Sequence, residues 1–550
     1  MQYVRSKLKS YYQLSTGHQL TMKILIADRI AEEGIAWLRE HGEFTVTEAY
    51  GAGLEVLLEA VREVEAIIVR SETQITVEVI EAARHLKVIG RAGVGIDNID
   101  VQAATERGVI VMNAPGGNTI ATAELAFTHL LCAARPIVPA AAAMRAGEWE
   151  RKRFIGRELY QKKLGILGMG RIGAEISKRA QAFGMTVLAY DPYLTEERAR
   201  TLHVKKSALA PLLQQVDYIT IHVPKTEATT GLINAEAFSQ MKDGVCLINC
   251  ARGGIIDEGA LLQALKDGKV QAVGLDVYES EPLATDHPLR AMEQTVLTPH
   301  LGASTQEAQI GVGIEIAQSV AETLSGKSPR NAVNMPAVDE RSLGLLQPYL
   351  KLGTSLGSLL QQMAPQQVEK IKITYFGAIT ELDLVPLTRR IQRGYLSKIS
   401  GEAANDINAP YLLKNLGVQT EVSQSEEKID YHDLIRLEVY SLEGATCSVA
   451  ATLFGKTQEP RVVHINDRDI EVALQGHWII LGNQDRPGTV GKVGMILGQD
   501  RINIANMVLS RNAVGGPVLS VFQLDSEPSQ AALEAIGKLE EVESVHTIAL

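Results

Sequence analysis

Three charged residues in the middle of the chain, Arg252, Glu281 and His300, have the side chains that oxidation of a secondary alcohol requires. Such a reaction needs a hydride acceptor, a base for the hydroxyl proton, and a cation for a carboxylate or carbonyl oxygen. An imidazole titrates near neutrality, so His300 suits the base, and Glu281 could hold its other ring nitrogen. The planar fork of Arg252 could bind a carboxylate and polarise the adjacent oxygen. The spacing alone also fits ordinary turn residues and surface charges.

A glycine-rich turn between an apolar run and a helical pattern, at residues 163–173, has the spacing of a dinucleotide site. Gly168 permits a tight turn, Gly170 lets the backbone approach a pyrophosphate, and Gly173 lets helix and strand pack closely. The helix amino terminus then faces the phosphates. A second apolar run ends in Asp191, about 20 residues on, where a carboxylate can bond a ribose 2′-hydroxyl and favours NAD over NADP. The simpler interpretation is a turn that binds nothing.

Short apolar runs alternate with helical stretches from residue 23 onward, which predicts parallel α/β sheets. In such sheets, function gathers in the turns after the carboxyl ends of the strands. In the first part of the chain this rule selects six candidates for substrate binding: Arg70, Ser71, Gly93, Val94, Gly95 and Asn113.

A chain of 550 residues is too long for one core, and its pattern changes several times. The last part has the order strand, helix, strand, strand, helix, strand, which is ferredoxin-like. We predict a disordered extension at 1–21, a discontinuous flavodoxin-like substrate domain at 22–119 and 303–331, a Rossmann-type dinucleotide domain inserted in it at 120–302, an α/β intervening regulatory domain at 335–470, and a ferredoxin-like domain at 475–550.

Net charge, cysteine spacing and the lengths of the apolar runs exclude several classes of partner and location. A net charge of −11 argues against nucleic acid or an anionic membrane as the partner of the whole body. The four cysteines show no metal or redox spacing, so we expect free thiols in a reducing, cytoplasmic compartment and no metal site. No apolar run reaches the ~18 residues of a membrane span. The first 21 residues are basic and lack an apolar core, which argues against a secretory signal but leaves open a plastid transit peptide or an upstream start before Met22.

Residues 22–330 resemble the D-2-hydroxyacid dehydrogenase family. The segment 164–191 is similar to the family's cofactor motif. Three later segments are similar to its arginine, glutamate and histidine motifs: 249–257 (NCARGGIID), 275–282 (LDVYESEP) and 298–302 (TPHLG). The resemblance implies an NAD-dependent oxidoreductase with three catalytic residues, Arg252, Glu281 and His300.

By the same resemblance, Asp276 would contact the nicotinamide amide, and residues 222–224 would line the adenosine side. The residues expected at the cofactor are Gly168, Gly170, Arg171, Ile172, Gly173, Asp191, Pro192, His222, Val223, Pro224, Cys250, Ala251, Arg252, Asp276, His300 and Gly302.

Residues 91–98 (RAGVGIDN) and 113–118 (NAPGGN), with Arg70 and Ser71, are similar to family members that act on 3-phosphoglycerate. The resemblance implies its oxidation to 3-phosphohydroxypyruvate, the entry to serine biosynthesis. A phosphorylated acid needs more positive charge than lactate, and Arg70, Arg135 and the basic run at 149–153 could supply it, the run from a partner subunit. That run also fits a solvated helix end.

The last part of the chain resembles ACT domains, which are small-ligand regulatory modules. The resemblance places Asn483, Asp485 and Asn503 at an L-serine effector, although a dimerising module without a ligand fits as well. It also implies a homodimer or homotetramer. Two alternatives stay open: a related dehydrogenase acting on glyoxylate, hydroxypyruvate or D-lactate, and an NADH-sensing binding protein similar to corepressors.

Overall fold

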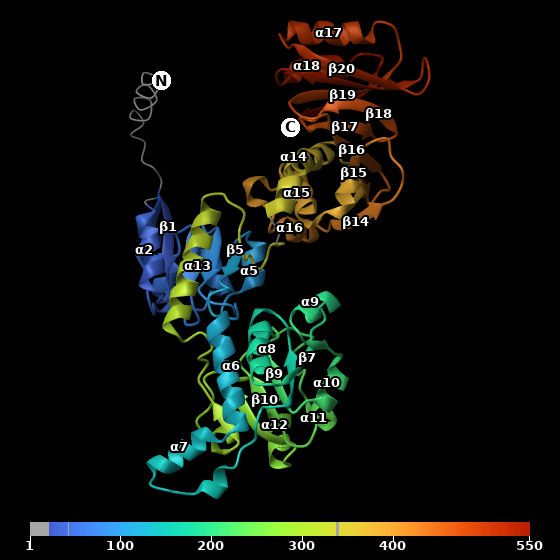
Figure 1. The fold of residues 1–550 in the computed structure, drawn as a ribbon. Coiled ribbons are helices and arrows are strands. Elements are labelled where there is room, and N and C mark those ends of the chain that lie inside the picture. The colour runs from blue at the N-terminus through green and yellow to red at the C-terminus, as the bar shows by residue number, and fades with distance from the viewer. Residues whose placement is uncertain (1–20, 42, 337–339) are drawn as a thin grey trace, which may run out of the picture.

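The structure is a computed structural model that describes residues 21–41, 43–336 and 340–550. Four sheets follow one another along the chain and build an elongated molecule, in which the second and fourth domains lie at opposite ends (Figure 1). The extension predicted to be disordered lies, apart from Thr21, outside the described residues.

The first domain contains a five-stranded parallel sheet in the flavodoxin-like order β2-β1-β3-β4-β5. Its strands are β1 (Met22–Ile26), β2 (Phe44–Glu48), β3 (Ala66–Val69), β4 (Val88–Arg91) and β5 (Ile110–Asn113). One face carries α3 (Leu54–Ala60), α4 (Val77–Ala82) and α5 (Val101–Glu106), and the other carries α2 (Glu32–Glu40). Apolar residues on both faces are buried, as the continuous apolar runs require.

Helix α13 (Gln306–Leu324) returns to the first domain from much later in the chain and packs against α2 and β4 (Figure 1). Its residues Val312, Ile316 and Val320 are buried there. The first domain is therefore built from two separate stretches of sequence.

The second domain contains a seven-stranded parallel sheet in the order β12-β11-β10-β9-β6-β7-β8, which is the Rossmann order with one strand added. Its strands are β6 (Lys163–Leu167), β7 (Thr186–Tyr190), β8 (Lys205–Lys206), β9 (Tyr218–Ile221), β10 (Val245–Asn249), β11 (Val270–Leu275) and β12 (Thr295–Leu297). Its helices are α6 (Thr119–Ala134), α7 (Ile137–Arg145), η1 (Arg151–Phe154), α8 (Arg171–Ala182), α9 (Glu196–Thr201), α10 (Leu209–Gln215), α11 (Ala235–Gln240), α12 (Glu258–Lys266) and η2 (Pro288–Ala291).

Within the described residues no single helix is long and apolar enough to cross a membrane. Helices α6 and α7 meet that length and composition only when taken together, and they are bent by 72° at the break between them.

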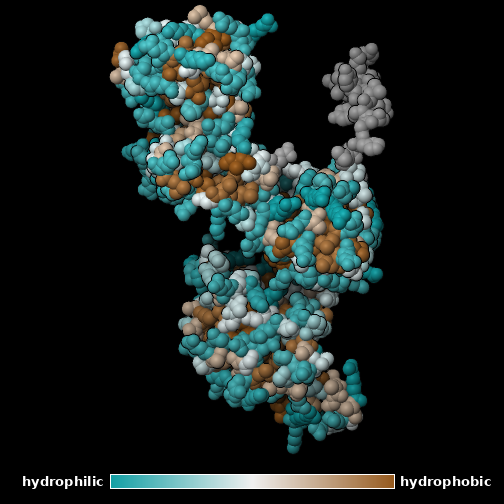
Figure 2. All heavy atoms as spheres, turned by 180° about the vertical axis from the view of Figure 1, so that it is seen from behind, coloured by the Kyte–Doolittle hydropathy of each residue, from teal (hydrophilic) through white to brown (hydrophobic). Residues whose placement is uncertain are grey.

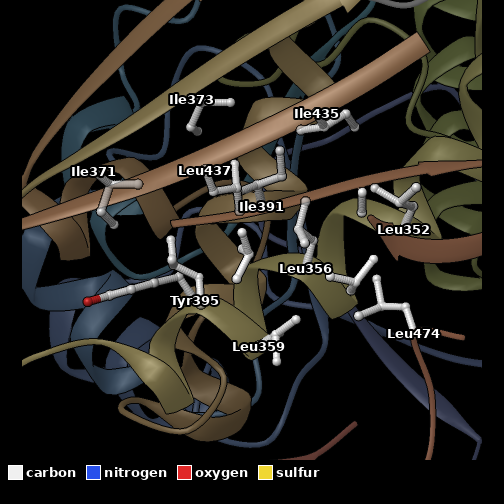
Figure 3. Packing of buried hydrophobic residues seen from close by; sticks show 14 of the residues in the cluster. Leu352, Leu356, Leu359, Ile371, Ile373, Ile391, Tyr395, Ile435, Leu437 and Leu474 are labelled. Carbon is white, nitrogen blue, oxygen red and sulfur yellow. The ribbon is translucent and has the colours of Figure 1, made fainter. Parts of the chain in front are cut away.

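The third domain places helices on one face of a six-stranded sheet in the order β14-β13-β15-β16-β17-β18. The strands are β13 (Val368–Gly377), β14 (Gln419–Ser425), β15 (Asp433–Ser441), β16 (Thr446–Phe454), β17 (Glu459–Ile465) and β18 (Arg468–Ala473), and the helical segments are α14 (Glu340–Met363), η3 (Ala378–Glu381), α15 (Val385–Leu396), η4 (Gly401–Ala403) and α16 (Ala409–Asn415). Leucines of α14 meet isoleucines of β13 and β15 in its core (Figure 3). The sheet runs to Ala473, beyond the predicted boundary at 470, because β18 pairs with β17.

The fourth domain is the predicted ferredoxin-like unit, with an antiparallel sheet in the order β20-β21-β19-β22. Its elements are β19 (His477–Gln484), α17 (Thr489–Gln499), β20 (Ile504–Arg511), β21 (Pro517–Leu524), α18 (Gln530–Gly537) and β22 (Val542–Ala549). Ile479 and Leu481 face the two helices, whereas Trp478 and Ile480 face the core of the third domain. The alternation along β19 therefore joins the third and fourth domains through one continuous core.

Candidate active site

The glycine turn after β6 has the shape that its spacing predicts. Gly168 adopts φ +94°, and a side chain there would overlap the carbonyl oxygen of His222 at 2.5 Å. A side chain at Gly173 would come within 2.2 Å of the carbonyl oxygen of Gly168, so the helix packs directly on the turn. A side chain at Gly170 would meet nothing within 4 Å, which leaves open space in front of the amino terminus of α8.

The start of α8 offers free backbone donors beside a carboxylate. No side chain caps the helix at Gly170, so the amides of its first turn are available to an anion. Asp191, directly after β7, accepts a hydrogen bond from the amide of Met169 in the turn at 2.8 Å. Its other oxygen accepts from the amide of Tyr193. The arrangement fits a dinucleotide, with the turn and helix holding the pyrophosphate and Asp191 positioned for a ribose hydroxyl.

The other residues expected at the cofactor lie at the same edge of the sheet, because each follows the carboxyl end of a strand. Pro192 follows β7; His222, Val223 and Pro224 follow β9; Cys250, Ala251 and Arg252 follow β10; Asp276 follows β11; His300 and Gly302 follow β12. Burial lowers the pKa of His222 to about 3, and burial raises the pKa of Cys250 well above its ordinary value. Both side chains are therefore uncharged at neutral pH.

His300 and Glu281 form the acid–base pair of the site. His300 Nδ1 lies 2.7 Å from Glu281 Oε2. Burial raises the pKa of Glu281, but its hydrogen bonds from His300 and from the amide of Tyr278, together with the charge of Arg252, outweigh burial and hold that pKa below its ordinary value. Glu281 is thus a carboxylate at neutral pH and accepts a hydrogen from Nδ1. In neutral His300, Nε2 is then the ring nitrogen that can take a proton.

The substrate candidates of the first domain gather at the carboxyl edge of its sheet. The buried Asp28 accepts hydrogen bonds from the amides of Arg70 (2.6 Å) and Thr73 (3.1 Å), which holds the turn of Arg70 and Ser71. In the neighbouring turn the side-chain amide of Asn113 donates to the carbonyl oxygen of Val94 at 2.7 Å. The residues after β3, β4 and β5 therefore form one continuous surface.

The two edges face each other and meet at Arg252, and we call the region between them the cleft. Its Nε donates to Asp97 Oδ2 at 3.1 Å. A side chain at Gly95 would overlap the guanidinium, with 1.8 Å to Nη2, so only a glycine lets Arg252 approach this backbone. The structure thus brings Arg252 to Gly95, although the two residues come from different domains.

Arg91, the last residue of β4, is a site residue that the sequence reasoning missed. Burial, together with the charges of Arg252 and Arg70 and against the opposite influence of Asp97, lowers the pKa of Arg91 to about 10. Its Nε is buried without a hydrogen-bond partner among the described residues. Three guanidinium groups therefore gather at this end of the cleft. The rule that selected Arg70 would have found Arg91, because it is a charged residue at the carboxyl end of a buried strand.

Arg135, predicted to bind substrate, does not reach the cleft of its own chain. It follows the far end of α6, whose 16 residues extend ~24 Å at ~1.5 Å per residue. The carbonyl of the preceding Ala134 accepts from the amide of Arg157, whose side chain donates to Gly244 before β10. Arg135 therefore lies at the amino edge of the sheet, opposite the cleft.

The three residues predicted at an effector also do not converge within one chain. Asn483 is buried and accepts from Ser520 Oγ at 2.6 Å. Asp485, just after β19, accepts from Arg511 and from the amide of Gly515. Asn503, just before β20, donates to Asp525 at 2.7 Å. Because β19 and β20 run in the same direction on either side of β21, Asp485 and Asn503 lie at opposite ends of the sheet.

Comparison with known proteins identifies this architecture. The family model for the D-isomer specific 2-hydroxyacid dehydrogenase NAD binding domain matches residues 127–302, and that for the D-3-phosphoglycerate dehydrogenase intervening domain matches residues 345–466. The crystal structure of a D-lactate dehydrogenase from Aquifex aeolicus complexed with NAD and lactic acid has a TM-score of 0.52 and 28% identity, and covers 57% of this chain and 100% of that one.

Two curated relatives match over almost their whole length. The D-3-phosphoglycerate dehydrogenase of Archaeoglobus fulgidus is 42% identical over 521 residues, 94% of this chain and 98% of that protein. That of Methanocaldococcus jannaschii is 40% identical over 531 residues, 96% of this chain and 100% of that protein. The predicted family and fold class are confirmed by these matches. Because the similarity runs through all four domains, the chain belongs to the D-3-phosphoglycerate dehydrogenase family.

Proposed function

We propose that the protein oxidises 3-phospho-D-glycerate to 3-phosphohydroxypyruvate with NAD, the first step of a phosphorylated route to L-serine. The observation that carries the proposal is the contact of Arg252 with Asp97 at the edge of the first domain, close enough to the His300–Glu281 pair for its charge to lower the pKa of Glu281. The names of the full-length relatives support the same reaction. An intact acid–base pair argues against the alternative of a sensor without turnover.

Residues of the chain serve the proton transfer and the binding of the substrate, and NAD would serve the hydride transfer. A bound NAD would supply the acceptor for the hydride that leaves C2 of the substrate. His300 Nε2 takes the hydroxyl proton, and Glu281 stabilises the resulting imidazolium through Nδ1. Arg252 binds the carboxylate and polarises the C2 oxygen. Closure of the two domains on the substrate would keep water from the reacting atoms.

The cluster of Arg70, Arg91 and Arg252 supports a substrate that carries more negative charge than lactate or glyoxylate. Burial of Arg91 and the proximity of the other two guanidinium groups raise the cost of this cluster without a bound anion. A carboxylate and a phosphate on one three-carbon molecule would neutralise it.

The test is a panel of initial rates with NAD on 3-phosphoglycerate, D-glycerate, D-lactate and glycolate. We expect kcat/KM for 3-phosphoglycerate to exceed that for D-glycerate by roughly 100-fold or more, because charged hydrogen bonds to the phosphate contribute about 1.5–3 kcal/mol each. A higher kcat/KM on D-lactate or glycolate would reassign the enzyme to one of the related dehydrogenases.

We also propose that the active enzyme is a homodimer or homotetramer. The arm formed by α7 and the residues after it projects from the second domain at the lower right of Figure 2. Its exposed apolar side chains include Trp149 and Ile155, which are 74% and 78% exposed. A second copy that covers this arm would also bring Arg135 and the basic run at 149–153 toward the cleft of the second copy. Mass measured by light scattering tests this, and a monomer would contradict it.

L-serine as an effector is a further part of the proposal, and the separation of Asp485 from Asn503 then requires that each serine site use two chains. A cytoplasmic location is supported by the free thiols of Cys132, Cys246, Cys250 and Cys447.

A further inference from the structure

His129, a buried residue of helix α6, lies outside the set expected at the site, yet its ring is hydrogen-bonded to the loop that carries His300. His129 Nε2 lies 2.9 Å from Thr298 Oγ1, and the residue is 2% exposed. The ring lies against Gly274 of β11, where a Cβ atom would come within 2.8 Å of Nδ1. Room for the imidazole therefore depends on the absence of a side chain at position 274.

The partners of Thr298 fix the direction of each hydrogen bond. Its hydroxyl donates to Asp276 Oδ1 at 2.6 Å, because a carboxylate only accepts. Thr298 Oγ1 must then accept from His129, so the hydrogen of the imidazole is on Nε2. His129 Nδ1 is buried without a hydrogen-bond partner among the described residues, so its protonation would bury an unpaired donor. Burial accordingly lowers the pKa of His129, against the opposite influence of Asp276.

Asp276 connects Thr298 to the loop that carries His300. Its carboxylate accepts from the amides of Leu301 (2.7 Å) and Gly302 (2.9 Å), and its carbonyl oxygen accepts from the amide of His300 (2.9 Å). His300 adopts φ +56°, a left-handed conformation that is uncommon for a residue with a side chain. Such a conformation persists where the surrounding structure over-determines it.

We propose that His129 is a positioning residue of the dehydrogenase: through Thr298 and Asp276, its Nε2–H holds the loop that keeps the His300 imidazole against Glu281. The inference rests on the proposed function and adds to it a residue that touches neither substrate nor cofactor. Without the donor of His129, Thr298 Oγ1 loses the hydrogen bond that it accepts. The Thr298 side chain is then free to rotate away from Asp276. The loop then samples backbone conformations in which His300 is misplaced.

The test compares two substitutions of similar size at position 129 in the full-length enzyme. His129→Met removes the donor, and we expect kcat on 3-phosphoglycerate to fall roughly 10- to 100-fold, the cost of misplacing a reacting group by about 1 Å. The Kd of NAD should stay within about twofold, and the primary isotope effect with substrate deuterated at C2 should rise because hydride transfer becomes more rate-limiting. His129→Gln retains an amide donor and should restore most of kcat. Leu130→Met, a buried neighbour on the same helix, should match the wild type.

A double-mutant cycle separates this role from general destabilisation. Thr298→Val should slow the enzyme as His129→Met does, and the double variant should be no slower than Thr298→Val alone, since both remove one pathway. Additive losses, equal damage from the Met and Gln variants, or an unchanged isotope effect would overturn the inference. If His129→Met does not fold, equal rates of Thr298→Val and Thr298→Ser would overturn it. Absence of turnover in the wild type would instead refute the proposed function itself.

Discussion

The cleft of the first two domains and the sheet of the fourth domain place their predicted residues in opposite ways. In the cleft, residues more than 150 positions apart in sequence come into contact, as Arg252 does with Asp97. In the fourth domain, Asp485 and Asn503 are close in sequence but lie at opposite ends of one sheet.

The difference follows from strand direction. In a parallel sheet every strand ends at the same edge, so the turns after β9, β10, β11 and β12 must meet. In the fourth domain β19 and β20 run in the same direction, and Asp485 follows one strand while Asn503 precedes the other. The eight residues of β20 alone extend about 26 Å at ~3.3 Å per residue. One chain can therefore complete the cleft, whereas the effector site would need two.

The prediction with the largest expected effect tests whether one chain supplies all the catalytic residues of the cleft. His300→Ala should lower kcat roughly 10³-fold, because the hydroxyl proton loses its acceptor, while the Kd of NAD stays unchanged. Stopped-flow and fluorescence titration measure the two quantities. His203→Ala is a matched control, since His203 has a similar left-handed backbone (φ +53°) but is exposed on the far side of the domain. Turnover near that of the control would remove His300 from its assigned role.

Low pH should lower the stability of the second domain more than that of the fourth. His222 Nδ1 is shielded from solvent and has no hydrogen-bond partner in the part of the chain that the structure describes, and burial lowers the pKa of His222 to about 3 from an ordinary 6.5. The unfolded chain therefore binds more protons, so the second domain should lose stability as pH falls from about 6.5 toward 3. The loss is on the order of 3 kcal/mol by pH 4. In the fourth domain His546 is exposed. Calorimetry should show the second domain unfolding first in acid, and His222→Gln should flatten its dependence on pH.

A smaller effect is expected at the adenosine end of the cleft. Asp191→Ala should raise the Kd of NAD about 10-fold and reduce the preference over NADP, because the ribose hydroxyl loses an acceptor and a 2′-phosphate loses a repelling charge. Glu196→Ala removes the same charge from α9 without touching the glycine turn. Equal cofactor preference in the two variants would count against the ribose role of Asp191.

Motifs and strand periodicity were sufficient to predict the four folds and the edge of each parallel sheet where chemistry gathers. Gly168 and Gly173 could be assigned from spacing because each meets a local backbone contact. The pairing of Arg252 with Asp97 could not, because it depends on how two domains close on each other. The distance of Arg135 from the cleft of its own chain could not be predicted either, because its charge is visible in the sequence but the length and direction of α6 are not. His129 reads as a core histidine until the hydrogen bond to Thr298 is seen.

The last prediction concerns the effector site of the fourth domain, which would need residues from two chains and can be tested by complementation. If L-serine binds between two fourth domains, with Asp485 from one chain and Asn503 from the other, then Asp485→Ala and Asn503→Ala should each abolish serine binding as pure proteins. A mixed dimer of the two variants contains one site with both substitutions and one with neither, so about half of the serine sites should return. Calorimetric titration of separately tagged, co-purified mixed dimers measures this number.

Sites built within one chain would give a different result, because every chain of the mixed dimer would still carry one substitution and no binding would return. Glu534→Ala, an exposed acid in the middle of α18, should leave serine binding unchanged and serves as the control. Absence of serine binding by the wild type would remove the effector from the proposal, while the cleft, whose residues meet in a single chain, would be unaffected.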